Sequence, residues 1–424
     1  MSMLLRRWFR IEDRELAPVL WAFAYFYFLL SAYYLLRPVR DEMGVRAGLG
    51  QLPWLFSATF VAMLLVTPLF GWAATRLPSR RLVPAVYGFF IVNILLFYLA
   101  MDRQIAPAWV AGSYFVWLSV FNLFVVSVFW SVMADLFRPD QSRRVFGLIA
   151  AGGSAGAITG PGLAAWLVGR VQPDGLLPLA ALLMLLALVC ALRLFTWRSR
   201  QSGSTPVQQQ GLGGGILEGI RLLAGSRYLL WIGVFIWCYT SLATFLYFEQ
   251  AAVVKASFAD SAERTQAFAL IDLVVNSLTI LLQLFVTARL ATRLGLSVTL
   301  ALLPALMLVG FTLLAMFPVF AVLAAVQVVR RAGNYAVTKP GREMLFTLVS
   351  QREKYKAKNV IDTLVYRGGD AVSGWLFAGL GALGLGTAGI AWVGVALAAL
   401  WTLVGLRLGR MGEARAAAYT RDEQ

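Results

Sequence analysis

The sequence contains no histidine among its 424 residues. This absence excludes zinc sites built on histidine, haem ligation by histidine, and histidine-based proton relays or catalytic triads. Charged residues are also scarce: they make up 14% of the chain, whereas a typical soluble domain carries about 25%. Because the chain is 60% hydrophobic, it cannot cover a soluble surface with so few charges, and an ordinary soluble enzyme is excluded.

Cysteine is almost absent. Cys190 and Cys238 are the only two, and both lie inside apolar runs, where a small buried apolar side chain is the ordinary interpretation. They form no disulfide framework and no metal-binding motif, so we expect neither a metal nor a cofactor. Acidic residues are fewer than basic ones, which gives a formal net charge of +16. The basic residues form no basic domain, so we expect no nucleic-acid partner.

Long apolar runs dominate what remains. A membrane-spanning helix needs roughly 20 mainly apolar residues, and the runs do not alternate as the strands of a barrel would. We therefore expect an all-α integral membrane protein with twelve transmembrane helices in two six-helix halves. The expected spans of the first half are 17–38, 53–74, 83–101, 108–136, 144–169 and 175–195. Those of the second half are 228–253, 264–288, 296–317, 319–338, 359–383 and 386–408.

The middle of the chain is a linker. Residues 198–215 are rich in Gly, Ser and Gln and cannot form a core. We expect an N-terminal half over 1–197, a cytoplasmic linker with a short amphipathic helix over 198–227, and a C-terminal half over 228–424. The segment Ala-Thr-Arg-Leu occurs after the second span and again after the eighth, which indicates duplication of a six-helix unit.

The basic residues predict the orientation. Most of them lie in alternate segments, beginning with the N-terminal tail and ending with the C-terminal tail. The opposite loops carry only Arg46, Arg103, Arg170, Lys255 and Arg264. Because loops on the cytoplasmic side are enriched in Lys and Arg, both termini are expected to be cytoplasmic.

Two kinds of motif carry a family resemblance. The loop Gly71-Trp-Ala-Ala-Thr-Arg-Leu-Pro-Ser-Arg-Arg81 resembles the loop signature of the major facilitator superfamily, with Thr75 where an acidic residue is usual. Leu36-Arg-Pro-Val-Arg-Asp41 resembles the Leu-Arg-Ser-Leu-Lys-Asp segment of the ATP/ADP antiporter (nucleotide transporter) family, and Lys339-Pro-Gly-Arg-Glu-Met344 resembles part of that family's tenth span. The resemblance to the bacterial branch of this family implies the major facilitator fold, nucleotide exchange and a bacterial inner-membrane location.

The resemblance also implies a set of transport charges. Exchange in the ATP/ADP antiporter family is associated with two Lys and two Glu in the membrane. When the chain is aligned with the family, Arg40 takes the position of the first Lys and preserves its positive charge. Leu118 falls near the position of the first Glu, Tyr247 or Glu249 near that of the second Glu, and Asp370 near that of the last Lys. At most two of the four charges are therefore present.

Charges embedded in the spans are the main site candidates, because each costs roughly 2.5–3.5 kcal/mol near the bilayer centre even on lenient insertion scales. Arg37, Arg40 and Asp41 share one helical face, with Tyr34 a turn away. Their guanidinium groups could hold a phosphate or carboxylate. The alternative is that Arg37 and Arg40 lie at the outer membrane interface and pair with Asp41 or Glu42 for structural reasons.

The second half supplies further candidates. We expect substrate-binding residues at Arg37, Arg40, Tyr34, Tyr247, Glu249, Arg367 and Asp370. We expect coupling or gating residues at Asp41, Asp135, Asp272, Asn276, Arg76, Arg80, Arg143, Arg144, Arg330 and Asp362. The arginines at cytoplasmic ends, together with Asp135, are expected to lock an inward gate through ion pairs. The alternatives are fixed helix–helix ion pairs for the embedded carboxylates and a surface position for Asp362.

These features predict a secondary active transporter that works by alternating access. The expected partners are the lipid bilayer and a small anionic solute such as a nucleotide, and we expect a monomer to function. Two alternatives remain: proton-coupled transport of a different solute, and a polytopic membrane enzyme or lipid-handling protein on the same fold. The glycines from Gly152 to Gly162 follow no strand and precede no Gly-Lys-Ser/Thr, so they indicate close helix packing instead of a phosphate loop.

Overall fold

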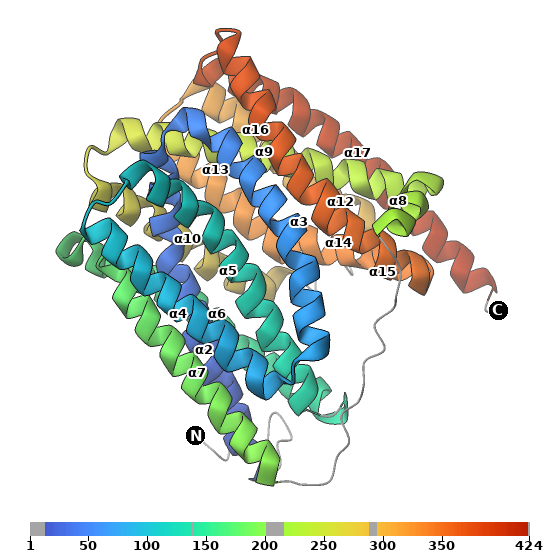
Figure 1. The fold of residues 1–424 in the computed structure, drawn as a ribbon. Coiled ribbons are helices and arrows are strands. Elements are labelled where there is room, and N and C mark those ends of the chain that lie inside the picture. Colours follow the sequence, from blue (N-terminus) through green and yellow to red (C-terminus); the bar gives the residue numbers. More distant parts are fainter. Residues whose placement is uncertain (1–12, 138, 201–215, 288–294, 423–424) are drawn as a thin grey trace. The chain divides into compact units, whose positions relative to one another are not determined.

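The computed structural model describes residues 13–137, 139–200, 216–287 and 295–422. These residues form helices joined by short connections and contain no strand (Figure 1). Within these described ranges, ten helices are long and apolar enough to cross a membrane. In lipid, a helix satisfies all of its backbone hydrogen bonds within one segment, which is why long apolar runs fold in this way. The expected all-helical membrane architecture is confirmed.

The helices of the first half follow the expected spans closely. They are α2 (Asp13–Ala47), α3 (Leu52–Arg76), α4 (Ser79–Asp102), α5 (Pro107–Leu136), α6 (Pro139–Val171) and α7 (Leu176–Arg200). A short 3₁₀ turn, η1 (Leu49–Gln51), precedes α3. Each of these six helices contains a candidate span.

The second half contains more and shorter elements. They are α8 (Ile216–Gly225), α9 (Arg227–Ser257), α10 (Ser261–Leu282), η2 (Gln283–Thr287), α12 (Gly295–Met316), α13 (Phe320–Gly333), η3 (Asn334–Thr338), α14 (Lys339–Leu345), η4 (Phe346–Leu348), α15 (Gln351–Val360), η5 (Ile361–Val365), α16 (Tyr366–Ala382) and α17 (Thr387–Asp422). Four of the helices, α9, α10, α12 and α17, contain candidate spans.

The two remaining expected spans, 319–338 and 359–383, are interrupted. A π turn, η3, separates α13 from α14, and a second, η5, separates α15 from α16. Pro340 accounts for the first, because it has no amide N–H to donate to the carbonyl of Ala336, and its ring crowds that carbonyl. These interruptions leave helices too short to qualify as spans, so the count of twelve remains a prediction.

The chain divides into two compact units. Unit 1 takes the described residues of Met1–Ala47, Val61–Gln210 and Phe258–Leu273. Unit 2 takes those of Gly48–Phe60, Gly211–Ser257 and Val274–Gln424. Helices α3 and α10 each contribute residues to both units. Most of the Gly- and Ser-rich linker, residues 201–215, lies outside the described residues.

Unit 1 is built around α2, which packs against α5, α6 and α7. The contact with α6 is closest where α6 carries glycine. A Cβ atom on Gly156 would lie 2.4 Å from the Tyr27 carbonyl oxygen, and one on Gly160 would lie 2.7 Å from the Ser31 carbonyl oxygen. The Ser31 hydroxyl lies 3.1 Å from that of Thr159 and adds a polar contact between the two helices. The glycines therefore serve helix packing, as the sequence indicated.

Unit 2 has α9 against α16 and α17, and α12 against α17. Trp401 of α17 is fully buried, and its ring lies 5.4 Å from that of Phe235 on α9. The short helix α8 packs against α15, and an ion pair between Glu218 and Lys356 joins them. This packing fixes α9, η3 and η5 around the cavity described below.

Candidate functional site

A cavity of about 450 Å³ lies within unit 2. Volumes in this range are typical of small-molecule sites. Its walls come from α9, η3, α14, α15, η5 and α16, and they combine rings with charges. The lining residues are Phe235, Ile236, Tyr239, Asn334, Tyr335, Thr338, Lys339, Arg342, Glu343, Lys358, Asp362, Tyr366 and Arg367.

The charges in this basic cavity are unbalanced. Lys339, Arg342, Lys358 and Arg367 carry four positive charges, and Glu343 and Asp362 carry two negative ones. Arg342 lies 3.4 Å from Asp362 and 3.7 Å from Glu343, and Lys358 is in direct ion-pair contact with Glu343. Among the described residues, no carboxylate lies within ion-pair distance of Lys339. The surplus of positive charge suits an anionic ligand.

The surroundings of Glu343 favour the ionised form of its carboxyl group. Partial burial of its carboxyl group raises the pKa, but the hydrogen bond and charge of Lys358, together with the charges of Arg342 and Lys339, outweigh that effect. The pKa of Glu343 therefore lies below its ordinary value. An anion entering the cavity would compete with a fully charged carboxylate for the same cations.

The two π turns place the cavity's residues. Asn334, Tyr335 and Thr338 belong to η3, and Asp362 belongs to η5. A π turn inserts an extra residue in a helix and rotates the side chains that follow it, and such turns occur often at functional sites. The turn at η3 directs Lys339 and Arg342 into the same cavity as Arg367, which lies in the first turn of α16, the helix that follows η5.

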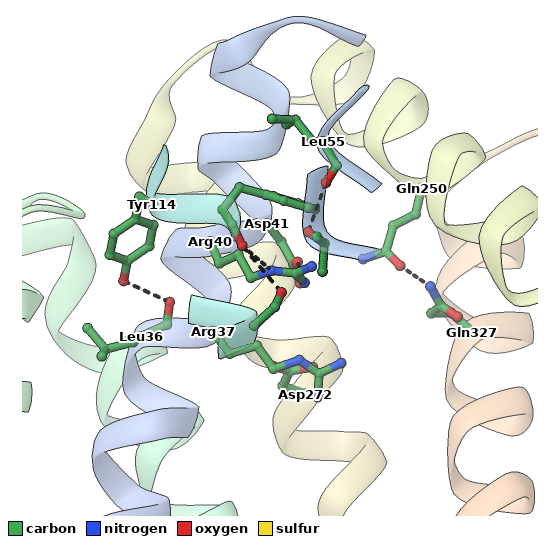
Figure 2. Close-up of polar contacts among 12 residues, drawn as sticks. Leu36, Arg37, Arg40, Asp41, Leu55, Tyr114, Gln250, Asp272 and Gln327 are labelled. Carbon is green, nitrogen blue, oxygen red and sulfur yellow. Dashed lines mark hydrogen bonds and ion pairs between the residues drawn. The ribbon is translucent and has the colours of Figure 1, made fainter. Parts of the chain in front are cut away.

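Unit 1 holds a second cluster of embedded charges, on α2 and α10. Figure 2 shows Arg37 beside Asp272, with 3.7 Å between Arg37 Nε and Asp272 Oδ2, and Arg40 beside Asp41 at 3.3 Å. Arg40 also donates to the Phe115 carbonyl at 3.2 Å, and its guanidinium group lies 3.9 Å from the centre of the Phe115 ring. Arg37 and Asp272, both predicted from sequence, are thus brought together, and Asp272 is only 1% exposed.

A fixed ion pair lies next to this cluster. Arg264 donates from Nε and from an η nitrogen to the two carboxylate oxygens of Glu42, each at 2.8 Å, and the Ser261 hydroxyl donates to the same carboxylate at 2.7 Å. Glu42 is fully buried. This bidentate pair joins the end of α2 to the start of α10, and no sequence pattern singled it out as a site.

Glu249 stands apart from these networks. It lies on α9, is 1% exposed, and neither of its carboxylate oxygens has a hydrogen-bond partner among the described residues. The neighbouring Gln250 accepts a hydrogen bond from Gln327, whose own oxygen accepts from Arg330 at 2.8 and 3.0 Å. Arg330 also donates to the Tyr239 hydroxyl at 3.3 Å, so it is held by neutral oxygens. Figure 2 shows the Gln250–Gln327 contact.

The other predicted substrate residues are dispersed. Tyr34 packs edge-on against Tyr33 in unit 1, and Tyr247 lies 5.4 Å from the Phe56 ring in unit 2. Arg367 lies 3.5 Å from Asp370, which accepts a hydrogen bond from Thr244 at 3.3 Å. Arg367 lines the basic cavity, whereas Asp370 does not. Asp362 also lines it, and Asn276 is buried on α10.

The predicted gating residues of the first half join neighbouring elements of unit 1. Ser79 donates to Asp135 at 2.5 Å, and Arg80 donates to the Phe195 carbonyl at 3.3 Å. Arg144 lies 3.2 Å from Glu15. Arg76 is exposed at the end of α3, and the side chain of Arg143 lies outside the described part of the chain.

Sequence reasoning missed most of the basic cavity. Tyr239, Tyr335, Lys339, Arg342, Glu343 and Lys358 were not among the predicted site residues. Two sequence patterns could have indicated these residues. Lys358 and Asp362 are four residues apart and so share one helical face, and Pro340 lies between the basic residues Lys339 and Arg342. Arg342 and Glu343 lie beyond the expected end of their span, so hydropathy gave them the appearance of loop residues.

The ten long apolar helices among the described residues indicate a polytopic membrane protein. The model of the Major Facilitator Superfamily matches residues 16–329, and the chain therefore belongs to this family. Among solved structures, the nucleoside transporter NupG is similar, with 14% identity, coverage of 95% of this chain and 100% of that one, and a TM-score of 0.62.

Two further structures share the fold. A bacterial homologue of the iron transporter ferroportin, in an inward-facing state, is 15% identical in sequence, and the TM-score is 0.67. The match covers 93% of this chain and 99% of that one. The POT family transporter PepTSo is 14% identical in sequence, and the TM-score is 0.65. The match covers 94% of this chain and 98% of that one. No curated protein sequence matches the chain.

Proposed function

We propose that this protein is a secondary transporter of small organic anions, with phosphorylated solutes such as nucleotides as the favoured class. It works by alternating access, in which a binding site opens to one side of the membrane at a time. The observation that carries this proposal is the basic cavity of unit 2, where four cations and three tyrosines surround about 450 Å³.

The chemistry of the cavity fits a solute with an anionic end and a flat, unsaturated end. Arg342 and Arg367 offer planar guanidinium groups that match phosphate oxygens in pairs, and Lys339 adds a compact charge. Tyr239, Tyr335 and Tyr366 offer ring faces, and stacking of a base on an aromatic side chain is tolerant of base identity. A metal ion would use few of these groups.

Two likenesses support the nucleotide class. The segments Leu36–Asp41 and Lys339–Met344 resemble those of the ATP/ADP antiporter family, and the second segment supplies Lys339 and Arg342 to the cavity. In this proposal Arg37, Arg40 and Asp272 of unit 1 form a second set of charges used in transport, and Asp41 sets the position of Arg40.

The test is uptake of radiolabelled ATP and ADP into proteoliposomes, with and without nucleotide inside. Uptake that requires internal nucleotide, and that collapses in Arg342→Gln but persists in Arg103→Gln, would support exchange. Arg103 lies in the exposed connection between α4 and α5, which makes it a matched control for loss of one arginine. Absence of uptake by folded wild-type protein under both conditions would overturn the nucleotide class.

A second candidate is proton-coupled transport, and the observation that favours it is Glu249. A buried carboxylate without a partner is costly when ionised and gains from binding a proton. Its protonation could follow the side to which the protein is open, which would couple solute movement to a proton gradient. Replacement of Glu249 by Gln is therefore expected to abolish accumulation driven by a pH gradient.

We also propose that the protein lies in a bacterial inner membrane with both termini in the cytoplasm, as a functional monomer. Both native cysteines are buried, so single introduced cysteines can report on sidedness. A membrane-impermeant thiol reagent added to intact cells is expected to label Gln104→Cys, in the α4–α5 connection, and not Ala418→Cys, near the C-terminus. Labelling in the opposite pattern would reverse the assigned orientation.

A further inference from the structure

A groove on the surface of unit 2 runs between α9 and α17. Its volume is about 370 Å³, and its lining residues are Arg227, Leu230, Trp231, Val234, Leu400, Leu403, Val404 and Arg407. On α9 these residues recur at three- and four-residue intervals, and the same is true on α17, so each helix presents one continuous face to the groove. A second hollow of about 610 Å³ adjoins it, sharing Leu403 and Arg407 and adding Arg410.

The groove is basic at one end and apolar along its length. Arg227 and Arg407 line the basic end, with Arg410 beside them in the adjoining hollow. Beyond them the walls are aliphatic, and Leu403 is 65% exposed although it is a large hydrophobic side chain. In a membrane protein such a surface faces lipid, so the apolar part needs no protein partner.

The arginines at this end are available for a ligand. Among the described residues, no carboxylate lies within ion-pair distance of Arg227 or Arg407. The guanidinium group of Arg407 lies 4.6 Å from the centre of the Trp231 ring, which orients it at the mouth of the groove. The nearby carboxylate of Glu413 already accepts hydrogen bonds from the Ser297 amide and hydroxyl at 2.9 and 2.8 Å.

We propose that this groove binds an anionic phospholipid, with the headgroup phosphate on Arg227, Arg407 and Arg410 and an acyl chain along Leu230, Val234, Leu400 and Leu403. Basic pockets between transmembrane helices recognise anionic headgroups in this way. The basic end lies where α9 begins and the apolar part of α17 ends, which is the cytoplasmic end in the expected orientation. A second copy of the chain fits poorly, because a symmetric contact would bring these arginines together.

The experiment is native mass spectrometry of the intact protein in mild detergent. Dioleoyl phosphatidylglycerol is titrated against dioleoyl phosphatidylcholine, which has the same chains and no net charge. The test variant is Arg227→Gln with Arg407→Gln. The control is Arg103→Gln with Arg170→Gln, because Arg170 also lies over a tryptophan ring, at 5.0 Å from Trp166, but outside the groove. Thermal unfolding of all variants in detergent establishes that they are folded.

We expect the wild type to retain phosphatidylglycerol in preference to phosphatidylcholine. Each arginine near an anionic surface contributes about a fivefold gain in affinity, so the double variant is expected to bind roughly 25-fold more weakly, while the control binds as the wild type does. Val234→Trp, which fills the apolar part and keeps both arginines, is also expected to weaken binding. Equal retention of the two lipids by the wild type, or unchanged phosphatidylglycerol binding by the double variant, would overturn the proposal.

Glycerol 3-phosphate provides the last arm of the test. It has the phosphate without the chains, and at the same concentration it is not expected to displace phosphatidylglycerol. Displacement would show that the arginines recognise a free organophosphate, and this would overturn the lipid assignment. The result is independent of which solute the protein transports, because the groove shares no residue with the basic cavity.

Discussion

Arg342 lies 3.4 Å from the carboxylate of Asp362, and this contact joins α14 to the π turn η5 across the basic cavity. The two residues are 20 positions apart and belong to segments that the sequence assigned to a loop and to a span. Since Arg342 also approaches Glu343, its charge is shared between two carboxylates. An anionic solute would have to replace at least one of these contacts, so binding and rearrangement of the cavity are linked.

Replacement of Arg342 tests the cavity directly. Arg342→Gln removes a hydrogen bond to a charged group, typically worth about 1.5–3 kcal/mol, so the KM for the transported anion is expected to rise about 10- to 100-fold. Uptake kinetics in proteoliposomes provide the measurement. Arg342→Lys keeps the charge without the planar fork and is expected to fall between wild type and Arg342→Gln. An unchanged KM in both variants would show that the anion binds elsewhere.

The Glu42–Arg264 pair predicts a specific pattern of stability. Arg264→Met leaves the fully buried Glu42 carboxylate uncompensated, and losses of this kind are about 3–5 kcal/mol. Adding Glu42→Gln should recover much of the lost stability, because the unpaired charge is then removed. Thermal unfolding in detergent of the two single variants and the double variant gives the coupling free energy between Glu42 and Arg264. Additive losses would show that the pair contributes no mutual stabilisation.

Glu249→Gln tests proton coupling. The amide keeps the size of the side chain and cannot exchange a proton, so accumulation driven by a pH gradient is expected to be lost. Counterflow exchange, which needs no net proton movement, should persist. Glu263→Gln, at the exposed start of α10, provides the control. If both activities respond equally to Glu249→Gln, the carboxylate has a structural role.

The lowered pKa of Glu343 predicts how stability changes with pH. A carboxyl group whose pKa is lower in the folded state stabilises the fold above its unfolded value, about 4.5, and this contribution disappears as the pH falls through the lower folded value. The wild type should therefore be more stable than Glu343→Gln at pH 6, and the gap should shrink below about pH 4.5. Thermal unfolding of both proteins between pH 3.5 and 6.5 measures it. A gap that is constant over this range would contradict the prediction.

Two glycines of α6 test the contact with α2. A Cβ atom on Gly156 would lie 2.4 Å from a backbone oxygen of α2, whereas one on Gly169 would meet nothing within 4 Å. Gly156→Ala should therefore destabilise the protein by about 1–3 kcal/mol, the usual cost of overpacking. Gly169→Ala should be neutral or stabilising by up to about 1 kcal/mol. Thermal unfolding that ranks the two variants in the reverse order would contradict the packing seen here.

Hydropathy predicted the helices well, because a run of about 20 apolar residues has few alternatives in a membrane. It did not predict the interruptions within the expected spans 319–338 and 359–383, where Pro340 and the π turns η3 and η5 change the helix locally. For the same reason Arg342 and Glu343 were not predicted as site residues, because they lie past the expected end of a span and yet line the cavity. Arg37 and Asp272 were recognised as embedded charges, and an ion pair was one alternative for Asp272, but the sequence did not identify Arg37 as its partner.

The sequence by itself determined that this is an all-helical membrane protein with charges buried in its spans, because composition and apolar run length act locally and need no knowledge of neighbours. Only the tertiary structure decided which charges meet. The pairing of Arg342 with Asp362 and of Glu42 with Arg264 depends on how each helix is rotated about its axis and where a π turn shifts its register. The same holds for Glu249, whose carboxylate has no hydrogen-bond partner among the described residues. Those rotations are set by close packing between helices far apart in sequence, which local hydropathy cannot encode.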